Sequence, residues 1–512
     1  MSIKLKIFRV ALIVVLISTQ ATQIFAQSAK PVIVTDKAEL EKLKLAVEAN
    51  PDSLSKHKAY INAIGLANPE LAKQYDLWIK KYPKIAVVPF ALGQAYEDTE
   101  SPKAKPYLLK TVAIDPKYSE AWSGLWIDAE RWGDFKASRE YLAKAVAADP
   151  SNANYAFYYA TSFGTIDVEK YRELSLSVAK KFPDSERGAQ ALYWLGSKST
   201  NDQDKLKYLE MLRTSYPPAK FSWSASGMSL YFSVLLKTEP EKAVVFAADM
   251  GKDAKEKEAK TWANLAIQAQ YIAVAKKLME QNKANEALTT LDKVKLSKYD
   301  NFNKNLVLLK AQAIDKTGNT KAAYDSLMHV FVKTPTMMFQ KALYAYGVKL
   351  GKDASQVKGD ILKSLDANAK EATPFTLKKY FGEGNTSLSD YKGKVILLTY
   401  WFPGCGPCRG EFPHFEDVVK QYKNKPLEYV GINIVSEQND YVIPFMKTSG
   451  YSFTPLEDVK GRVKGNLDNR NAAPMNFIID QSGHLIFSNF RISEDNEDDL
   501  KLMIDLLLGA QA

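Results

Sequence analysis

The sequence predicts a multidomain protein in which an all-α helical solenoid is followed by an α/β domain. The first observation is a proline that recurs every 32 to 34 residues: Pro51, Pro83, Pro116, Pro150, Pro183 and Pro217. The second is a change near Thr373, after which short apolar runs alternate with helical stretches. The third is length, since 512 residues are enough for roughly two to four domains.

The first 26 residues have the pattern of a secretory signal peptide. Three basic residues, Lys4, Lys6 and Arg9, precede an apolar run over 10–17, and Ala26 occupies the small-residue position of a cleavage site. The run is shorter than the roughly 20 residues that cross a bilayer, and no later segment is long and apolar enough. We therefore expect residues 1–26 to be removed, leaving a periplasmic protein without a transmembrane segment. An uncleaved membrane anchor is the alternative.

The net charge of +10 does not by itself indicate a nucleic-acid partner. Lysine and glutamate are interspersed along the chain, as on a solvated surface. No module combining aromatic and basic residues for nucleic-acid binding is visible. We therefore expect no nucleic-acid binding.

The region 36–365 is expected to form the solenoid. In its clearest unit, which ends at Pro150, Trp122 and Leu125 lie on one face of a helix and Gly133 marks the turn to the next. A period near 34 residues that ends in proline resembles the tetratricopeptide repeat. Such units bury their apolar faces only by stacking on neighbours. The resemblance implies a concave groove that docks a peptide or protein, and a purely structural spacer is the alternative.

The small, polar segment 366–372 is expected to be a linker, and 373–512 to be the α/β domain. Fully apolar runs in this region predict strands buried on both faces. Two apolar runs separated by Gln481-Ser482-Gly483 predict an antiparallel hairpin. The expected buried strands are 395–400 and 427–435, the hairpin is 476–480 with 484–487, and the last helix is 494–508.

The chain has two cysteines, and they stand three positions apart in Cys405-Gly406-Pro407-Cys408. An apolar run precedes this motif and a helical pattern follows it, which is the geometry of a thiol–disulfide site. A helix N-terminus lowers the pKa of a thiol from ~8.5 toward ~7. Pro407 suits a first helical turn, because its missing N–H group is not needed there.

Other roles for the cysteine pair fit the sequence less well. Structural zinc requires four ligands, and the chain has no second cysteine pair. Covalent haem requires a histidine after the second cysteine, where Arg409 stands. A peroxiredoxin requires a threonine three residues before its cysteine, where Phe402 stands. We expect no metal and no cofactor. A vestigial, inactive cysteine pair is the remaining alternative.

Several motifs follow one another in the order of a known family: Pro374-Phe375-Thr376-Leu377, Ser387-Leu388-Ser389-Asp390, Lys392-Gly393-Lys394, Cys405-Gly406-Pro407-Cys408-Arg409 and Glu411-Phe412-Pro413. They resemble the TlpA/ResA-like branch of the thioredoxin superfamily, whose members are extracytoplasmic thiol–disulfide oxidoreductases. The resemblance implies a nucleophilic Cys405, a resolving Cys408 and a cis proline at Pro474. One departure is Thr399, which stands where thioredoxin has a buried aspartate, so the proton-transfer group for Cys408 is unassigned.

The resemblance also implies how a substrate is held. The backbone of Ala473 is expected to meet an extended substrate segment, and the expected substrate-binding set is Trp401, Gly406, Pro407, Ala473 and Pro474. The Gly-Pro pair matches reducing thioredoxins, with potentials near about −270 mV rather than the about −120 mV of strong oxidants. We expect a reductase of protein disulfides that an electron-donor thiol protein re-reduces. The alternative is a repeat-type binding scaffold that carries a redox-sensing or inactive thioredoxin-like domain.

Overall fold

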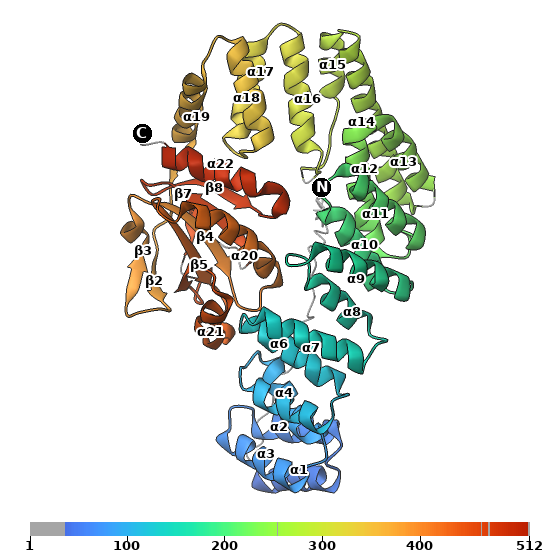
Figure 1. Ribbon diagram of the computed structural model, residues 1–512, viewed down its shortest axis with the longest axis vertical. Coiled ribbons are helices and arrows are strands. Elements are labelled where there is room, and N and C mark those ends of the chain that lie inside the picture. The colour runs from blue at the N-terminus through green and yellow to red at the C-terminus, as the bar shows by residue number, and fades with distance from the viewer. Residues whose placement is uncertain (1–35, 253, 299, 462, 469–471, 510–512) are drawn as a thin grey trace, which may run out of the picture.

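The structure, a computed structural model, describes residues 36–252, 254–298, 300–461, 463–468 and 472–509. The expected signal peptide, residues 1–26, lies outside this range. Among the described residues, none of the helices combines the length and apolar character that membrane crossing requires. Figure 1 shows a curved array of helices that closes on a domain built around a sheet.

The first part of the described chain is entirely helical up to residue 368. This confirms the expected helical solenoid followed by an α/β domain. The helices are α1 (Lys37–Ala49), α2 (Leu54–Ile64), α3 (Pro69–Lys81), α4 (Val87–Asp98), α5 (Ala104–Ile114), α6 (Ser119–Arg131), α7 (Phe135–Ala148), α8 (Ala153–Thr161), α9 (Val168–Lys181), α10 (Glu186–Lys198), α11 (Asp202–Ser215), α12 (Ser222–Thr238), α13 (Pro240–Lys252), α14 (Glu256–Glu280), α15 (Ala284–Leu291), α16 (Asn303–Lys316), α17 (Thr320–Phe331), α18 (Met337–Lys349) and α19 (Ala354–Asn368).

Helix pairs are joined where the sequence places a glycine or a capping residue. Gly133 turns the chain from α6 into α7 with φ +71°, and Gly318 joins α16 to α17 with φ +89°. Both are left-handed conformations that glycine adopts without steric cost. Asp134 then caps α7 by accepting a hydrogen bond from the Ala137 N–H at 3.0 Å. The expected turn at Gly133 is therefore confirmed.

The second part is an eight-stranded mixed sheet in the order β1-β8-β7-β4-β5-β6-β2-β3. Strand β4 runs parallel to β5, and β5 to β6, while the other pairs are antiparallel. The strands are β1 (Lys370–Glu371), β2 (Thr376–Lys379), β3 (Asn385–Ser387), β4 (Val395–Trp401), β5 (Leu427–Asn433), β6 (Thr454–Glu457), β7 (Met475–Ile479) and β8 (His484–Phe490). The helices are α20 (Gly406–Val419), α21 (Asn439–Ser449) and α22 (Glu497–Leu508), with short 3-10 turns η1 (Leu388–Tyr391), η2 (Lys420–Tyr422), η3 (Ser436–Gln438), η4 (Gly465–Leu467) and η5 (Glu494–Asn496).

Alternation along β4 divides the core of this domain between the two faces of the sheet. Val395, Leu397 and Trp401 share a cluster with buried residues of α20, α21 and α22. Ile396 and Leu398 belong to a separate cluster on the opposite face. All seven residues of β4 are buried, as the apolar run predicts for a central strand.

The segment 366–372 does not have the form of the expected linker. Helix α19 continues to Asn368, and β1 begins two residues later. In β1, Lys370 and Glu371 pair with Leu485 and His484 of β8, which would otherwise be an unpaired edge strand. The polar composition of 366–372 thus reflects a helix end and a short edge strand. The division into domains at this position stays a proposal.

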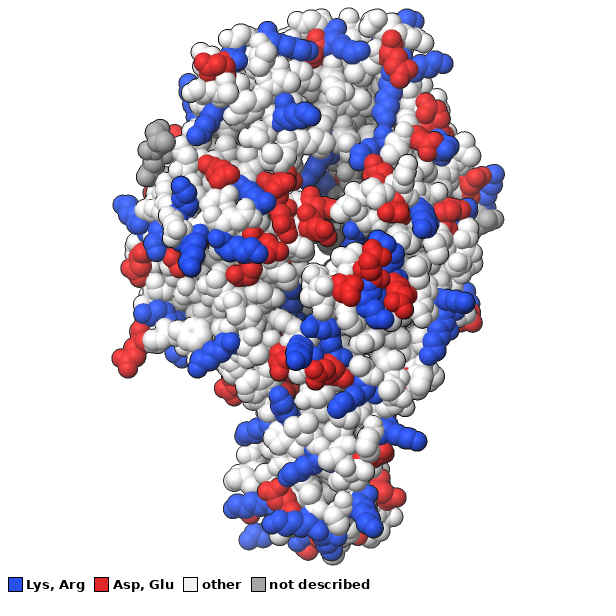
Figure 2. All heavy atoms as spheres, viewed as in Figure 1, with Lys and Arg blue, Asp and Glu red and all other residues white. Residues whose placement is uncertain are grey.

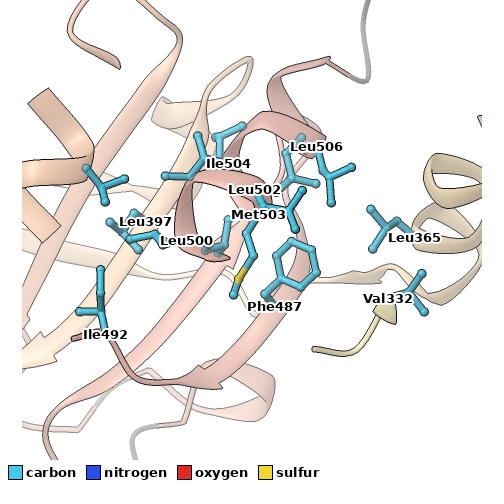
Figure 3. Close-up of a cluster of buried hydrophobic side chains, with 14 of the residues drawn as sticks. Val332, Leu365, Leu397, Phe487, Ile492, Leu500, Leu502, Met503, Ile504 and Leu506 are labelled. Atoms are coloured by element: carbon cyan, nitrogen blue, oxygen red, sulfur yellow. The ribbon is translucent and has the colours of Figure 1, made fainter. Parts of the chain in front are cut away.

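The apolar core runs without interruption from the last repeat helices into the sheet domain. One buried cluster contains Phe331 of α17, Leu343 of α18 and Leu365 of α19 together with Leu397 and the apolar face of α22. In Figure 3 the side chains of α22 lie between Leu397 on one side and Leu365 and Val332 on the other. Buried residues between Val47 and Tyr155 form a separate core.

Candidate active site

The two cysteines lie where strand β4 ends and helix α20 begins. Cys405 is the N-cap residue of α20, and its Sγ accepts a hydrogen bond from the Cys408 N–H at 3.3 Å. The two residues form a disulfide with their Cα atoms 5.3 Å apart. Cys405 is 2% exposed and Cys408 is fully buried. The N-terminus of α20 carries the positive end of the helix dipole, which favours a thiolate on Cys405 after reduction.

The cis peptide bond lies beside this disulfide because of strand pairing. The bond between Ala473 and Pro474 is cis. In the antiparallel pair of β4 and β7, Met475 is opposite Tyr400. Pro474 therefore stands next to the end of β4, from which the chain turns to Cys405.

The structure separates the expected substrate-binding residues into two groups. Gly406 and Pro407 are exposed at the first turn of α20, and Ala473 is half-buried beside the buried Pro474. Trp401, in contrast, is fully buried, with its ring against Phe412, Phe445 and Phe453. Its position on β4 directs the side chain to the sheet face that the helices cover. The Trp401 side chain is thus a core element behind the site and is not at the surface.

A buried polar network surrounds Thr399, the residue that stands where thioredoxin has a buried aspartate. Thr399 donates a hydrogen bond from Oγ1 to Asn476 Oδ1 at 2.8 Å, and Asn476 Nδ2 donates to Glu411 Oε2 at 2.9 Å. Thr399 and Asn476 are fully buried, and Glu411 is 6% exposed. Arg491 pairs with the other oxygen of Glu411 at 3.7 Å. The network connects α20 with β4 and with the strand that follows the cis proline.

Burial raises the pKa of Glu411 above its ordinary value of 4.5, although the hydrogen bond from Asn476 and the charge of Arg491 oppose the rise. Glu411 stands three residues after Cys408, so both side chains lie on the same side of α20. The spacing of three residues between Cys408 and Glu411 is the sequence signal from which a carboxyl group on this side of the helix could have been predicted.

No group of three or more histidine, cysteine or acidic side chains that could hold a metal ion occurs in the part of the chain that the structure describes. His414 is also absent from the immediate site. Its Nδ1 pairs with Glu497 of α22 at 2.7 Å, which connects α20 to the last helix.

A redox-active cysteine pair that follows a central strand, begins a helix and lies beside a cis proline defines a thioredoxin-like thiol–disulfide oxidoreductase. Residues 369–488 match the AhpC/TSA family. The chain belongs to the family of thioredoxin-like thiol–disulfide oxidoreductases that includes the relatives below, and the region that they share with it is the sheet domain.

Two relatives come from Bacillus subtilis (strain 168). The chain is 33% identical over 140 residues to the thioredoxin-like protein YneN, a region that covers 27% of this chain and 78% of the relative. It is 32% identical over 124 residues to the thiol-disulfide oxidoreductase ResA, covering 24% of this chain and 68% of that protein. A solved structure of a thioredoxin-family thiol:disulfide interchange protein from Chlorobium tepidum TLS is 26% identical, with a TM-score of 0.23, and covers 28% of this chain and 97% of that one.

Proposed function

We propose that this protein is an exported reductase of protein disulfides, with Cys405 as the nucleophile and Cys408 as the resolving thiol. The observation that carries the proposal is the Cys405–Cys408 disulfide at the N-terminus of α20. The helix dipole stabilises a thiolate at Cys405, and only the thiolate attacks a disulfide. Export is proposed from the signal-like pattern of residues 1–26, which implies a periplasmic location.

The proposed reaction transfers two electrons in two steps. The Cys405 thiolate attacks a substrate disulfide, so that one Cys405–substrate disulfide forms and the first substrate sulfur leaves as a thiolate. The Cys408 thiolate then attacks Cys405 Sγ, which releases the second substrate sulfur and leaves the Cys405–Cys408 disulfide. The substrate is reduced to a dithiol and the enzyme is oxidised. A thiol protein that donates electrons must reduce the pair again before the next cycle.

Cys408 must lose its proton in the second step, although it is fully buried. Glu411 is proposed as the acceptor. Its carboxyl group is buried on the same side of α20, and a pKa raised by burial brings a carboxyl group closer to the range in which it can exchange protons near neutral pH. Asn476 orients this carboxyl group through its 2.9 Å hydrogen bond.

The proposed substrate surface consists of the exposed Gly406 and Pro407 together with the backbone of Ala473. Glycine and proline leave the front of the disulfide free of large side chains. The solenoid is proposed to position the protein substrate. Figure 2 shows the molecule hollowed between the sheet domain and the helical array, with acidic and basic side chains mixed around the opening.

The deciding experiment is the redox potential of the Cys405–Cys408 pair, measured by equilibration in dithiothreitol and glutathione buffers with thiol trapping. A potential at or below about −250 mV supports a reductase, and a value near about −120 mV would instead make the protein an oxidant. Insulin reduction by the wild type should be lost in Cys405→Ser. Cys408→Ser should retain the first attack and accumulate the mixed disulfide, which non-reducing gels detect.

A further inference from the structure

The turn that leads into Cys405 is held by side chains that reach to the solenoid. Arg409 follows Cys408 directly, and its Nη1 donates to the Pro403 carbonyl at 3.0 Å. Its Nη2 donates to the Glu130 carboxylate of α6. The Arg409 side chain is 16% exposed and that of Glu130 is 25% exposed, so the ion pair is largely shielded from water. One backbone group of the turn is thus connected through Arg409 to the helical array.

A second connection begins at the next residue of the same turn. The Gly404 N–H donates to Gln438 Oε1, and Gln438 Nε2 donates at 2.6 Å to Glu100, in the turn after α4. Gln438 is 1% exposed. It lies so close that a Cβ atom on residue 404 would stand 2.7 Å from Gln438 Nε2. Glycine at 404 is what permits this approach.

The two carboxylates are themselves held in place or shielded. Arg131, which is 5% exposed, donates to Glu100 Oε1 at 3.2 Å and pairs with Glu97 at 3.5 Å. Glu130 precedes Arg131 on α6. The solenoid therefore presents a small charged cluster to the sheet domain, and Glu100 and Glu130 are the members whose hydrogen bonds lead to the turn before Cys405.

These contacts fall on the backbone that determines where Cys405 stands. The Cys405 N–H donates to the Phe402 carbonyl at 2.9 Å, which makes Pro403 and Gly404 the two central residues of the turn. The Pro403 carbonyl accepts from Arg409, which pairs with Glu130. The Gly404 N–H donates to Gln438, which donates to Glu100. The charges matter as well, because a cation next to a thiol favours the thiolate and a carboxylate opposes it. Pairing with Glu130 reduces the effect of Arg409.

We propose that Glu100 and Glu130 of the solenoid are positioning residues for the redox reaction: they act through Gln438 and Arg409 to hold the turn before Cys405 and to limit its thiolate character. The inference rests on the proposed role of Cys405 as nucleophile. It means that the solenoid is part of the redox machinery, and that separating the two parts makes the pair more oxidising.

The test uses the full chain and compares three variants with the wild type. Glu100→Ala/Glu130→Ala removes both connections. Glu130→Gln removes one charge but keeps a hydrogen-bond acceptor, and so remains informative if the double variant does not fold. Asp128→Asn is the matched control, because Asp128 also lies on α6 and accepts a hydrogen bond across the same contact, from Tyr441 at 2.9 Å, in a bond that involves neither Pro403 nor Gly404.

Two readouts separate positioning from a merely structural role: the dithiol–disulfide equilibrium, and the pH profile of Cys405 alkylation in the reduced protein. The variants leave unchanged the charged groups that contact the replaced carboxylates, which are Arg409, Arg131 and, through Arg131, Glu97, and also Glu411 of α20. For the double variant we expect at least a threefold shift of the equilibrium toward the dithiol, about 14 mV for a two-electron couple. We also expect alkylation at pH 6 to be at least threefold faster, and Glu130→Gln to shift both readouts in the same direction.

Asp128→Asn should leave both readouts at their wild-type values. The inference is overturned if the double variant matches the wild type in both readouts, or if Asp128→Asn shifts them as far as Glu130→Gln does. A wild type that forms no dithiol–disulfide couple at all would instead refute the proposed function. The wild-type measurement therefore distinguishes the two failures.

Discussion

Two of the contacts between the solenoid and the sheet domain, here called seams, differ in their chemistry. The C-terminal seam, defined by Val332, Leu365 and Leu506, is apolar and belongs to one continuous core. The N-terminal seam, where α6 and α7 meet α20 and α21, combines aromatic contacts with charged and hydrogen-bonded pairs such as Glu130 with Arg409. The C-terminal seam is held by apolar burial, whereas opening the N-terminal seam would leave buried polar groups such as Gln438 without partners.

Both seams include a feature of the other kind, which shows how each is aligned. In the C-terminal seam, Asp499 of α22 accepts a hydrogen bond at 2.8 Å from the Met337 N–H at the start of α18, where the helix dipole favours an anion. In the N-terminal seam, the Phe135 ring of α7 lies 6.1 Å from that of Phe445 in α21. A polar group orients the apolar seam. The N-terminal seam is anchored by three aromatic pairs: Trp132 with Tyr441, and Phe135 with Phe445 and Tyr451.

The largest effect is expected from a cavity in the C-terminal seam. Leu365→Ala removes a side chain that is 5% exposed, and such truncations cost about 2–5 kcal/mol. Because the core is continuous, hydrogen exchange should accelerate in α17–α19 and in β4 and β5 together. Denaturant unfolding with residue-level exchange measures both.

Leu142→Ala is the matched control for this prediction. Leu142 is 1% exposed but belongs to the separate core of the first helices. Its truncation should accelerate exchange in the helices around α7 and leave β4 and β5 protected. Equal loss of protection in β4 for both variants would contradict the contrast between the seams.

The next effect concerns the closest backbone approach in the N-terminal seam. A Cβ atom on Gly133 would lie 2.8 Å from the Phe445 carbonyl oxygen of α21. Gly133→Ala therefore adds a clash to the cost of a left-handed alanine, which is about 1–2 kcal/mol. Hydrogen exchange should rise in α21 but not in α22.

Gly318→Ala is the control that measures the cost of a left-handed alanine without a clash. Gly318 occupies the corresponding turn between α16 and α17 with φ +89° and has nothing within 4 Å of its Cβ position. We expect Gly133→Ala to cost about 1–3 kcal/mol more than Gly318→Ala, the range for overpacking. Equal costs would mean that α21 moves aside freely.

The two seams also show which features could be predicted from the sequence and which could not. The strand before Cys405, the helix after it and the turn at Gly133 follow from apolar runs and turn residues within a few positions of each other. The contact of Glu130 with Arg409 joins residues 279 positions apart, and no local pattern encodes it. The same limit explains Trp401, whose burial depends on Phe445 and Phe453, and the expected linker at 366–372, which β8 recruits into the sheet. The cis proline at Pro474 could be placed because a family resemblance, and not the composition, located it.

A pH-dependent effect is expected at Glu411, which lies on α20 between the two seams. Burial raises the pKa of this carboxyl group above its ordinary value of 4.5. A folded-state pKa above the unfolded value means that the stabilising contribution is complete below the unfolded pKa and is lost as the pH rises through the folded pKa. Glu411→Gln should therefore gain stability relative to the wild type as the pH rises above about 4.5. Urea unfolding of the oxidised protein across a pH series measures the difference.

The same variant should lose activity while it gains stability. Without the carboxyl group, the proposed proton acceptor for Cys408 is missing, so the second step slows and mixed disulfide accumulates. Glu416→Gln, on the same helix and bonded to the Ser452 N–H at 2.7 Å, is the control that should leave the resolving step unchanged. A pH-independent stability difference for Glu411→Gln would show that the carboxyl group titrates normally.

The smallest effect is expected from a third contact across the opening, between Lys205 of α11 and Asp495 of η5. Their charged groups are 3.8 Å apart, and the Asp495 side chain is 43% exposed. Solvent-exposed ion pairs contribute about 0.2–1 kcal/mol and weaken with salt. Asp495→Asn should thus change the free energy of unfolding by less than about 1 kcal/mol, and the difference should vanish in 1 M salt. A larger, salt-independent loss of unfolding free energy would show that this ion pair is a third structural seam. The Lys205–Asp495 contact would then contribute to holding the N-terminal seam together.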